Sequence, residues 1–179
     1  MPDYEDYMRI ALELAREAGN DGETPVGCVV TDPGGAVIGR GRNRREKNQN
    51  ATSHAELEAI AGACKVLGDW RLTGCSLYVT LEPCPMCAGA VIMSRIAKVF
   101  FGAREKQTGS CGSVINLFME PYGQTVGVTG GILADECSAL LSGFFSDVRT
   151  GQDSGFRIQD SGDAGMESSL PYDIRGVDV

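Results

Sequence analysis

The chain has 179 residues, of which 42% are hydrophobic and 22% charged, and its formal net charge is −8. These values are typical of one globular domain and exclude fibrous proteins. No apolar run approaches the roughly 18 residues that a membrane helix needs. The first residues, MPDYEDYMRI, also lack the basic-then-apolar order of a signal peptide. We therefore expect a cytoplasmic protein without membrane contact.

Seven cysteines and a single histidine, His54, narrow the chemistry. An odd number of cysteines without an export signal argues against a disulfide framework and for thiols that are kept reduced. Metal binding or core packing is then the expected use of cysteine. A single histidine excludes two-histidine zinc proteases and proton relays between histidines.

Charge is distributed unevenly along the chain. Residues 150–179 carry six acidic and two basic side chains and are rich in Gly and Ser. We expect this acidic extension to be flexible and to follow a single domain at 1–149. The segment RGRNRREK at 40–47 instead places five basic residues beside one acidic residue. A basic patch of this kind can bind phosphate groups even when the net charge is negative.

The first half of the chain predicts two helices around a β-hairpin. A helical repeat of apolar residues starts at Tyr4 and ends at Gly19-Asn20, and strands at 26–31 and 36–39 form the hairpin. After a polar loop, Ser53 is expected to cap the second helix. The apolar side chains that this helix is expected to bury are Leu57, Ile60, Ala61, Cys64 and Leu67.

The second half alternates strands and helices. Strands are predicted at 76–81 and 97–102, with a short helix between them that starts beside two prolines. The stretch 103–130 is glycine-rich, with one helical turn expected near 114–117. A last helix carries an apolar stripe that ends in Phe144 and Phe145, which we expect to serve mainly in packing. The alternation predicts an α/β sandwich with some parallel pairing.

The residues best suited to chemistry stand at two predicted helix starts. His54-Ala55-Glu56 opens the second helix, and Pro83-Cys84-Pro85-Met86-Cys87 opens the third. Cysteines three residues apart at a helix start lie on one face, and the positive end of the helix dipole favours the thiolate that a metal needs. Three protein ligands are typical of an open catalytic zinc site. We therefore expect His54, Cys84 and Cys87 to hold one Zn²⁺ per subunit.

Glu56 lies two residues after His54 and is expected to act as the catalytic carboxylate without binding the metal. Zinc lowers the pKa of a bound water from about 15.7 towards about 7. A nearby carboxylate can take that proton and deliver it to a ring nitrogen and a leaving amine. The pattern H-x-E…P-C-x-x-C is the described signature of zinc deaminases, TadA among them. The alternative is a closed structural zinc site with a fourth cysteine, which would not need Glu56.

Longer blocks extend the resemblance. HAELEAI, YVTLEPCPMCAGAVIMSRI, FGAREKQTGSCGS and GGILADECSALLSGFF resemble successive blocks of the bacterial tRNA adenosine deaminases over about residues 5–147. The resemblance implies a three-layer α/β/α sandwich of the cytidine-deaminase type, with a mixed five-stranded sheet flanked by helices. It also implies a homodimer without an organic cofactor. Its implied reaction is hydrolysis of an amidine C–N bond, which converts the wobble adenosine of a tRNA anticodon stem-loop to inosine.

The same resemblance assigns substrate contacts. Asn43 would hydrogen-bond the flipped base, and its pocket would be shaped by Pro25, Val26 and the backbone around Ala55 and Glu82. The basic residues that we consider for contact with the RNA backbone are Arg42, Arg44, Arg45 and, with weaker support, Lys106. Two features depart from the family pattern. The chain ends in an acidic rather than a basic extension, and Met93 stands where members often have His.

Two other functions stay open at this point. A deaminase of a free base or nucleoside, of the guanine, cytosine or adenosine type, fits the acidic balance and the missing basic tail. The TLEPCPMCAGA and GAREKQTG blocks favour tRNA instead. A zinc module that only binds RNA or a partner is the third possibility, against which the intact Glu56 argues. The cysteines for which we expect core packing are Cys28, Cys64, Cys75 and Cys137.

Overall fold

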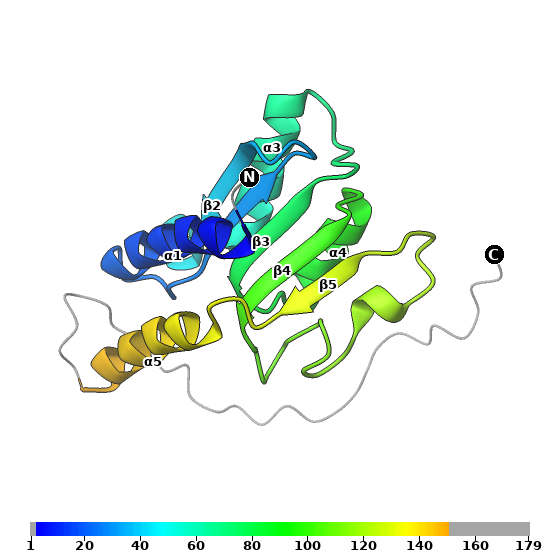
Figure 1. Cartoon of the computed structure of the whole chain (residues 1–179). Helices are drawn as coiled ribbons and strands as arrows, with labels where there is room; N and C mark the ends of the chain where they lie inside the picture. The colour runs from blue at the N-terminus through cyan, green and yellow to red at the C-terminus, as the bar shows by residue number, and fades with distance from the viewer. Residues whose placement is uncertain (1–2, 151–179) are drawn as a thin grey trace, which may run out of the picture.

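The computed structural model describes residues 3–150, so the acidic extension predicted from 150 onward lies outside the described residues, except for the backbone of Thr150. A five-stranded sheet crosses the molecule in the order β2-β1-β3-β4-β5 (Figure 1). The strands are β1 (Gly27–Thr31), β2 (Val37–Arg42), β3 (Ser76–Leu81), β4 (Lys98–Ala103) and β5 (Gly127–Gly130). The helices are α1 (Tyr4–Asn20), α2 (Arg45–Asn48), α3 (Ala55–Leu67), α4 (Pro85–Met93), α5 (Ala134–Thr150) and the 3₁₀ turn η1 (Leu117–Met119).

The sheet is mixed, as predicted. β1 pairs antiparallel with both β2 and β3, whereas β3, β4 and β5 run parallel. Parallel neighbours need a crossover, and α4 supplies the one between β3 and β4. The loops that leave the carboxyl ends of β3 and β4 therefore meet at one end of the sheet, where ligands of open α/β sheets usually bind.

Two elements were absent from the sequence prediction. β5 consists of Gly-Val-Thr-Gly, a composition that predicts no strand, and it forms because it pairs with β4. The four-residue α2 was expected as a polar loop. The predicted helical turn near 114–117 lies slightly later, at η1. Within residues 3–150, no helix combines the length and apolar character that crossing a membrane requires.

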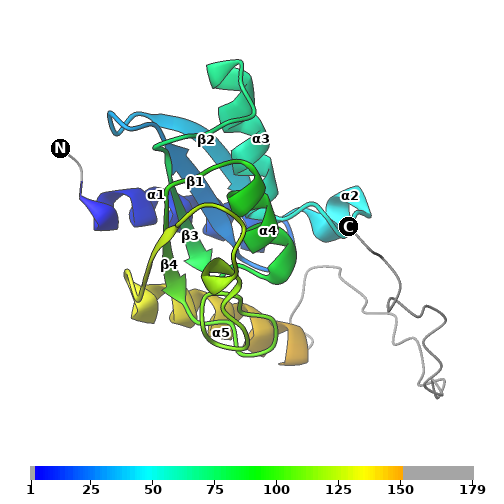
Figure 2. The ribbon, with the colours of Figure 1, turned by 90° about the vertical axis from the view of Figure 1, so that its right-hand side faces the viewer.

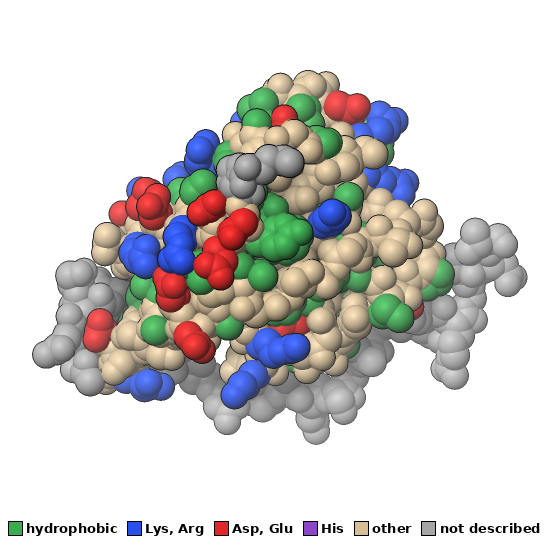
Figure 3. Space-filling model, in the orientation of Figure 1, with side chains coloured by type: hydrophobic (Ala, Val, Ile, Leu, Met, Phe, Trp, Pro, Cys, Tyr) green, Lys and Arg blue, Asp and Glu red, His purple; other side chains and the backbone are tan. Residues whose placement is uncertain are grey.

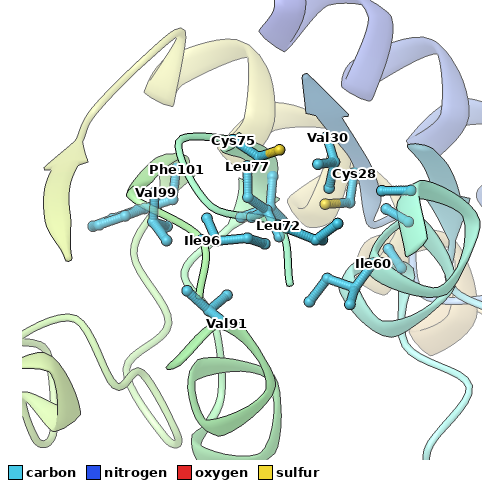
Figure 4. Packing of buried hydrophobic residues seen from close by; sticks show 14 of the residues in the cluster. Cys28, Val30, Ile60, Leu72, Cys75, Leu77, Val91, Ile96, Val99 and Phe101 are labelled. Carbon is cyan, nitrogen blue, oxygen red and sulfur yellow. The ribbon is translucent and has the colours of Figure 1, made fainter. Parts of the chain in front are cut away.

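Helices cover both faces of the sheet and form three layers (Figures 1 and 2). On one face, Val29, Tyr78 and Phe100 pack with Tyr7 of α1. α5 joins this layer, where its buried Cys137 packs with Met8 and Leu12 of α1. The opposite face packs against α3 and α4 and forms the larger core, drawn in Figure 4. Its labelled sheet residues are Cys28, Val30, Leu77, Val99 and Phe101.

The charged outer surface of α1 contributes little to the stability of the fold. Acidic and basic side chains lie beside one another there (Figure 3). Arg9 is 3.3 Å from a carboxylate oxygen of Glu5 and 3.4 Å from one of Glu136 in α5. Exposed ion pairs of this kind stabilise a fold by less than about 1 kcal/mol each. Apolar burial between the layers therefore holds the helices on the sheet.

The buried face of α3 differs from the predicted one. The helix buries Ala55, Glu56, Ala59, Ile60 and Ala63, whereas Ala61 and Leu67 are exposed. The reason lies in β2, where Gly39 and Gly41 face the helix. A Cβ atom at either glycine would overlap a carbonyl oxygen of α3. Small residues on both sides let the two backbones approach closely, which fixes the start of α3 relative to the sheet.

The start of α3 also corrects a prediction. The N-cap residue is His54, in extended conformation (φ −87°, ψ 151°) and without a side-chain capping bond. The hydroxyl oxygen of Ser53, the predicted cap, instead accepts a hydrogen bond from Asn48 Nδ2 at 3.1 Å. The His54 side chain is therefore not used for capping and is available for another contact.

Candidate metal centre and active-site cleft

The starts of α3 and α4 bring the predicted metal ligands together. His54 precedes α3, and Cys84 precedes α4, which begins with Pro85. The Nδ1 atom of His54 lies 3.8 Å from Cys84 Sγ and 3.5 Å from Cys87 Sγ. Among the residues that the structure describes, these three form the one group of His, Cys, Asp or Glu donors close enough to share a metal ion, with all ligand atoms within 4.8 Å of one another.

The donor set fits zinc. Zn–S bonds of about 2.3 Å and Zn–N bonds of about 2.1 Å at a tetrahedral angle place nitrogen and sulfur about 3.6 Å apart. The two separations measured from His54, 3.5 and 3.8 Å, agree with that value. No fourth cysteine or carboxylate joins the group within residues 3–150, which argues against a closed structural site. Three nitrogen and sulfur ligands are typical of catalytic zinc.

The surroundings of Cys84 favour its thiolate, which is the form of cysteine that binds a metal. A hydrogen bond from Cys87 lowers the pKa of the Cys84 thiol to about 4, against the effect of burial, and His54 adds to this lowering. The hydrogen bond with Cys84 raises the pKa of His54. The same sulfur pair and burial raise the pKa of Cys87. Negative charge is thus concentrated on Cys84, at the N-terminus of α4, where the helix dipole favours it.

Glu56 lies in the first turn of α3 with only 4% of its surface exposed. Burial raises the pKa of its carboxyl group above the usual value, although its own backbone N–H and the charge of His54 oppose this. A carboxyl group whose pKa is shifted towards neutrality can both accept and release a proton. Glu56 is not part of the metal-ligand group but lines the same cleft as His54 and Cys84.

A cleft of about 350 Å³ opens beside these residues. It contains five of the residues that the sequence predicted for substrate or RNA contact, namely Val26, Asn43, Arg45, Ala55 and Glu82. Pro25 is buried and is not among the lining residues, and neither are Arg42, Arg44 and Lys106. The lining residues that the sequence analysis did not select are Thr24, Leu81, Glu105, Gln107, Thr108 and Phe145.

Asn43 is held at the rim of the cleft directly after β2. Its backbone N–H donates to Val26 O at 3.0 Å, and its Nδ2 donates to Thr24 O at 3.4 Å. The residue is buried. Its backbone and side chain are both bound to the 24–26 segment, which fixes its amide beside the cleft.

The side chain of Glu82 organises one wall of the cleft. Its carboxylate accepts hydrogen bonds from the backbone N–H groups of Glu105 (3.1 Å), Cys111 (2.9 Å) and Ser113 (3.1 Å), and from the Ser113 hydroxyl. Burial favours a higher pKa, but the bonds from Ser113, Cys111 and Glu105 lower the pKa of Glu82 below its usual value. The loop that carries Glu105, Gln107 and Thr108 is therefore tied to the end of β3. These three residues belong to the GAREKQTG block, from which the sequence analysis drew only a family resemblance.

The four basic residues that the sequence suggested for RNA contact have different surroundings. Arg42 is 17% exposed, and its guanidinium lies 3.1 Å from Glu17 and 2.9 Å from Asp21. Arg44 Nε is 3.7 Å from a carboxylate oxygen of Glu58. Arg45 is 55% exposed and lines the cleft, with Glu46 at 3.1 Å as its ion-pair partner. Lys106 is exposed, between the lining residues Glu105 and Gln107.

Phe145 departs from its expected packing role. Its side chain is 46% exposed and lines the cleft near the end of α5, while the partly buried Phe144 meets it edge to face at 5.5 Å between ring centroids. Helical spacing gave both rings the same expected role. The position of α5 against the sheet determines which ring faces the cleft.

The remaining cysteines agree with the packing prediction. Cys28, Cys75 and Cys137 are buried and Cys64 is half-buried, all as free thiols. Burial raises the pKa of the Cys28 thiol, which makes it a poor nucleophile. The backbone N–H of Cys111 donates to Glu82, and burial and the charge of Glu82 raise the pKa of the Cys111 thiol to about 12, which favours its neutral form.

Comparison with known proteins agrees with this site. Residues 1–103 match the cytidine and deoxycytidylate deaminase zinc-binding region. The chain is 46% identical over 144 residues to the tRNA-specific adenosine deaminase of Bacillus subtilis, which covers 80% of this chain and 89% of that protein. A solved structure from a study of A-to-I editing by tRNA:A34 deaminases superposes with a TM-score of 0.72 and 39% identity, over 75% of this chain and 98% of the other.

Guanine deaminase from Nitrosomonas europaea also superposes, with a TM-score of 0.67 and 25% identity over 82% of this chain and 86% of the other. The identity is lower than that to the tRNA deaminases. His54, Cys84 and Cys87 form the zinc-binding site of the matched region. The chain belongs to the zinc-dependent cytidine and deoxycytidylate deaminase family and, within it, to the tRNA-specific adenosine deaminases.

Proposed function

We propose that this chain hydrolyses the 6-amino group of the wobble adenosine in a tRNA anticodon stem-loop, which leaves inosine and ammonia. One observation carries the proposal: a buried carboxylate, Glu56, lines a cleft with a three-ligand zinc site, in a chain 46% identical to a tRNA-specific adenosine deaminase. The catalytic unit is the domain at 1–149, with the acidic extension from 150 outside it.

Zinc held by His54, Cys84 and Cys87 supplies Lewis-acid activation of the attacking water. The chain's own part is proton transfer. Glu56 accepts a proton from the water whose oxygen bonds to C6 of the adenine, and delivers it to N1 of the ring. It then takes the proton of the new C6 hydroxyl group and transfers it to the amino group, so that the C6 carbonyl forms, the C6–N bond breaks and ammonia leaves. One water is consumed and Glu56 returns to its starting state.

The adenine has to leave its stack to reach Glu56. Flipping a base costs a few kcal/mol and costs least where the base is already unpaired, as in an anticodon loop. In the proposal, the amide of Asn43 hydrogen-bonds the flipped base, and Val26 and the backbone of Ala55 bound its pocket. Phe145 at the mouth of the cleft offers an exposed ring on which a neighbouring unstacked base can lie.

The proposed contacts with the RNA backbone are Arg45 and Lys106. Arg45 lines the cleft and Lys106 is exposed beside it, whereas Arg42 and Arg44 do not line the cleft and Arg42 is only 17% exposed. Cations at the mouth of the cleft attract the anionic stem-loop although the net charge of the chain is −8.

We further propose that the active protein is a homodimer that associates through α4 and the 114–122 segment. Large apolar side chains are exposed there without cover in the described chain, namely Met86, Met93, Val114, Ile115, Met119 and Tyr122. η1 packs against α4, which places the middle of the 114–122 segment beside that helix. Aromatic residues and Met are enriched in protein–protein interfaces.

Deamination of a free base is the second candidate, because the guanine deaminase of Nitrosomonas europaea shares the fold. The deciding experiment measures ammonia release by zinc-loaded protein on four substrates: an anticodon stem-loop with adenosine at the wobble position, adenosine, guanine and cytosine. Inosine formed in the stem-loop alone is the expected result. Turnover of guanine with the stem-loop unchanged would replace the proposal with the second candidate.

A further inference from the structure

Glu23 is a buried acidic residue that the proposed reaction does not use. It lies in the connection between α1 and β1, and only 1% of its surface is exposed. Its two carboxylate oxygens accept hydrogen bonds from backbone N–H groups of α2, at 2.7 Å from Lys47 and 3.2 Å from Glu46. A buried carboxylate is costly unless it is hydrogen-bonded, and these contacts meet that requirement.

These contacts cap α2 from a distant part of the sequence. α2 has only four residues, and its N-cap residue, Arg44, makes no side-chain capping bond. A helix this short is not stable by itself in water. The Glu23 carboxylate satisfies two of its free N–H groups and places negative charge at the positive end of the helix. Figure 2 shows α2 projecting from the body of the molecule. Besides the Glu23 contacts, Lys47 Nζ of α2 lies 3.8 Å from a carboxylate oxygen of Asp21.

The helix held in this way carries a residue of the cleft. Arg45 is its first residue and lines the cleft, and among residues 3–150 its guanidinium has Glu46 of the same helix as its one ion-pair partner. Its position therefore follows from the position of α2. The adjacent Thr24 accepts the hydrogen bond from Asn43 Nδ2. Residues 23 and 24 thus contact both Asn43, which is proposed to bind the base, and α2, which carries the proposed phosphate contact Arg45.

We infer that Glu23 is a positioning residue for the RNA substrate, which holds α2 so that Arg45 stands at the mouth of the cleft. This inference rests on the proposed tRNA deamination. It predicts a change in RNA binding opposite to the one expected from net charge alone. Loss of a negative charge from an acidic protein normally strengthens RNA binding, whereas loss of the Glu23 charge should weaken it.

The test compares Glu23→Gln with Glu13→Gln. Glu13 lies on the exposed face of α1, so the second variant makes the same change in net charge without touching α2. With zinc-loaded protein and the adenosine stem-loop, Glu23→Gln should raise KM about tenfold and change kcat by less than about twofold, because charged hydrogen bonds are lost only from the helix that carries Arg45. Glu13→Gln should leave KM unchanged or lower it.

A double variant separates positioning from general damage. If Glu23 acts through Arg45, then adding Glu23→Gln to Arg45→Ala should raise KM no further than Arg45→Ala alone. Melting temperature and zinc content are measured on every variant. If Glu23→Gln does not yield zinc-loaded protein, Glu23→Asp, which shortens the reach by one methylene group, takes its place with the same expected rise. A KM that is unchanged, or effects that multiply fully in the double variant, would overturn the inference.

Amide hydrogen exchange separates this inference from the proposed function. The N–H groups of Glu46 and Lys47 should exchange about tenfold faster or more in Glu23→Gln, with the exchange rates in α3 unchanged. If the wild-type chain deaminates only a free base, the proposed function fails and the RNA role of Glu23 fails with it, while faster exchange still establishes the cap. Unchanged exchange would refute the cap, whatever the substrate.

Discussion

The Nδ1 atom of His54 lies 3.5 Å from the Sγ atom of Cys87, although the two residues are 33 positions apart in the chain. The close approach results from two packed helices. α3 is set by its contact with the glycines of β2, and α4 is set by the crossover from β3 to β4. Because both helices start at the same end of the sheet, their first residues meet.

Glu56→Gln is expected to lower kcat by a factor of about 10² to 10⁴, because an amide cannot accept the proton from water. Its zinc content should equal that of the wild type, since Glu56 is outside the ligand group. Ammonia release and metal analysis on the same preparation check both points. A variant with wild-type turnover would refute the proposed proton transfer.

Cys87→Ser is expected to lose zinc and, with it, activity. Removal of one of three ligands leaves the remaining pair without enough donors to hold the ion tightly. Cys111→Ser is the matched control, because Cys111 is close to the cleft but outside the ligand group. It should retain one zinc per chain. The zinc content of both variants is measured by metal analysis after dialysis. Retention of zinc by Cys87→Ser would exclude that residue as a ligand.

Arg45→Ala should reduce the salt dependence of stem-loop binding. Each lost phosphate contact in a single-stranded region lowers the slope of log K against log salt by about 0.7. Arg42→Ala should lower the melting temperature and leave the slope unchanged, because its guanidinium pairs with Glu17 and Asp21. Titrations at several salt concentrations test both variants. An equal slope for Arg45→Ala and the wild type would place the phosphate contact elsewhere.

Glu82→Gln should destabilise the protein in a pH-dependent way. The pKa of Glu82 is lowered in the folded state, so the charged carboxylate stabilises the fold above its unfolded pKa, near 4.3, and this contribution is lost as the pH falls through the folded-state value. At pH 7 the variant should lose about 1–3 kcal/mol, from the bonds to the 105–113 loop.

Urea unfolding at pH 7 and at acidic pH measures this difference. The gap between wild type and Glu82→Gln should narrow as the pH falls through the lowered pKa of Glu82, because below that pKa the carboxyl group is neutral like the amide. Glu13→Gln serves as the exposed control and should track the wild type. A gap that stays constant with pH would show that lost packing, and not the charged hydrogen bonds, causes the destabilisation.

Met119→Asp should convert the proposed dimer to a monomer. The side chain is 78% exposed in the isolated chain, so the substitution costs little in folding but places a charge in the proposed interface. Val66→Asp, at the exposed end of α3, is the control and should leave the dimer intact. Light scattering at micromolar concentration gives the masses, and a monomeric wild type would refute the dimer.

The chemistry of this protein could be predicted from local patterns. A helix start with His-x-Glu and another with Pro-Cys-x-x-Cys predicted the zinc ligands. Spacing of one turn places Cys84 and Cys87 together, whereas the packing of α3 beside α4 brings His54 to them. Alternating strands and helices indicated the layered fold. The antiparallel hairpin was also predicted correctly, since its turn residues are local.

Other features were decided by tertiary structure. The edge strand β5 pairs with β4, and the backbone of α2 is bound by Glu23, which lies in another segment of the chain. Packing against Gly39 and Gly41 selected the alanine face of α3 over the larger apolar residues. Which of the two adjacent phenylalanines reaches the cleft depended on the placement of α5. In each of these cases a distant residue supplies the deciding contact, and a local pattern holds no information about a contact across the fold.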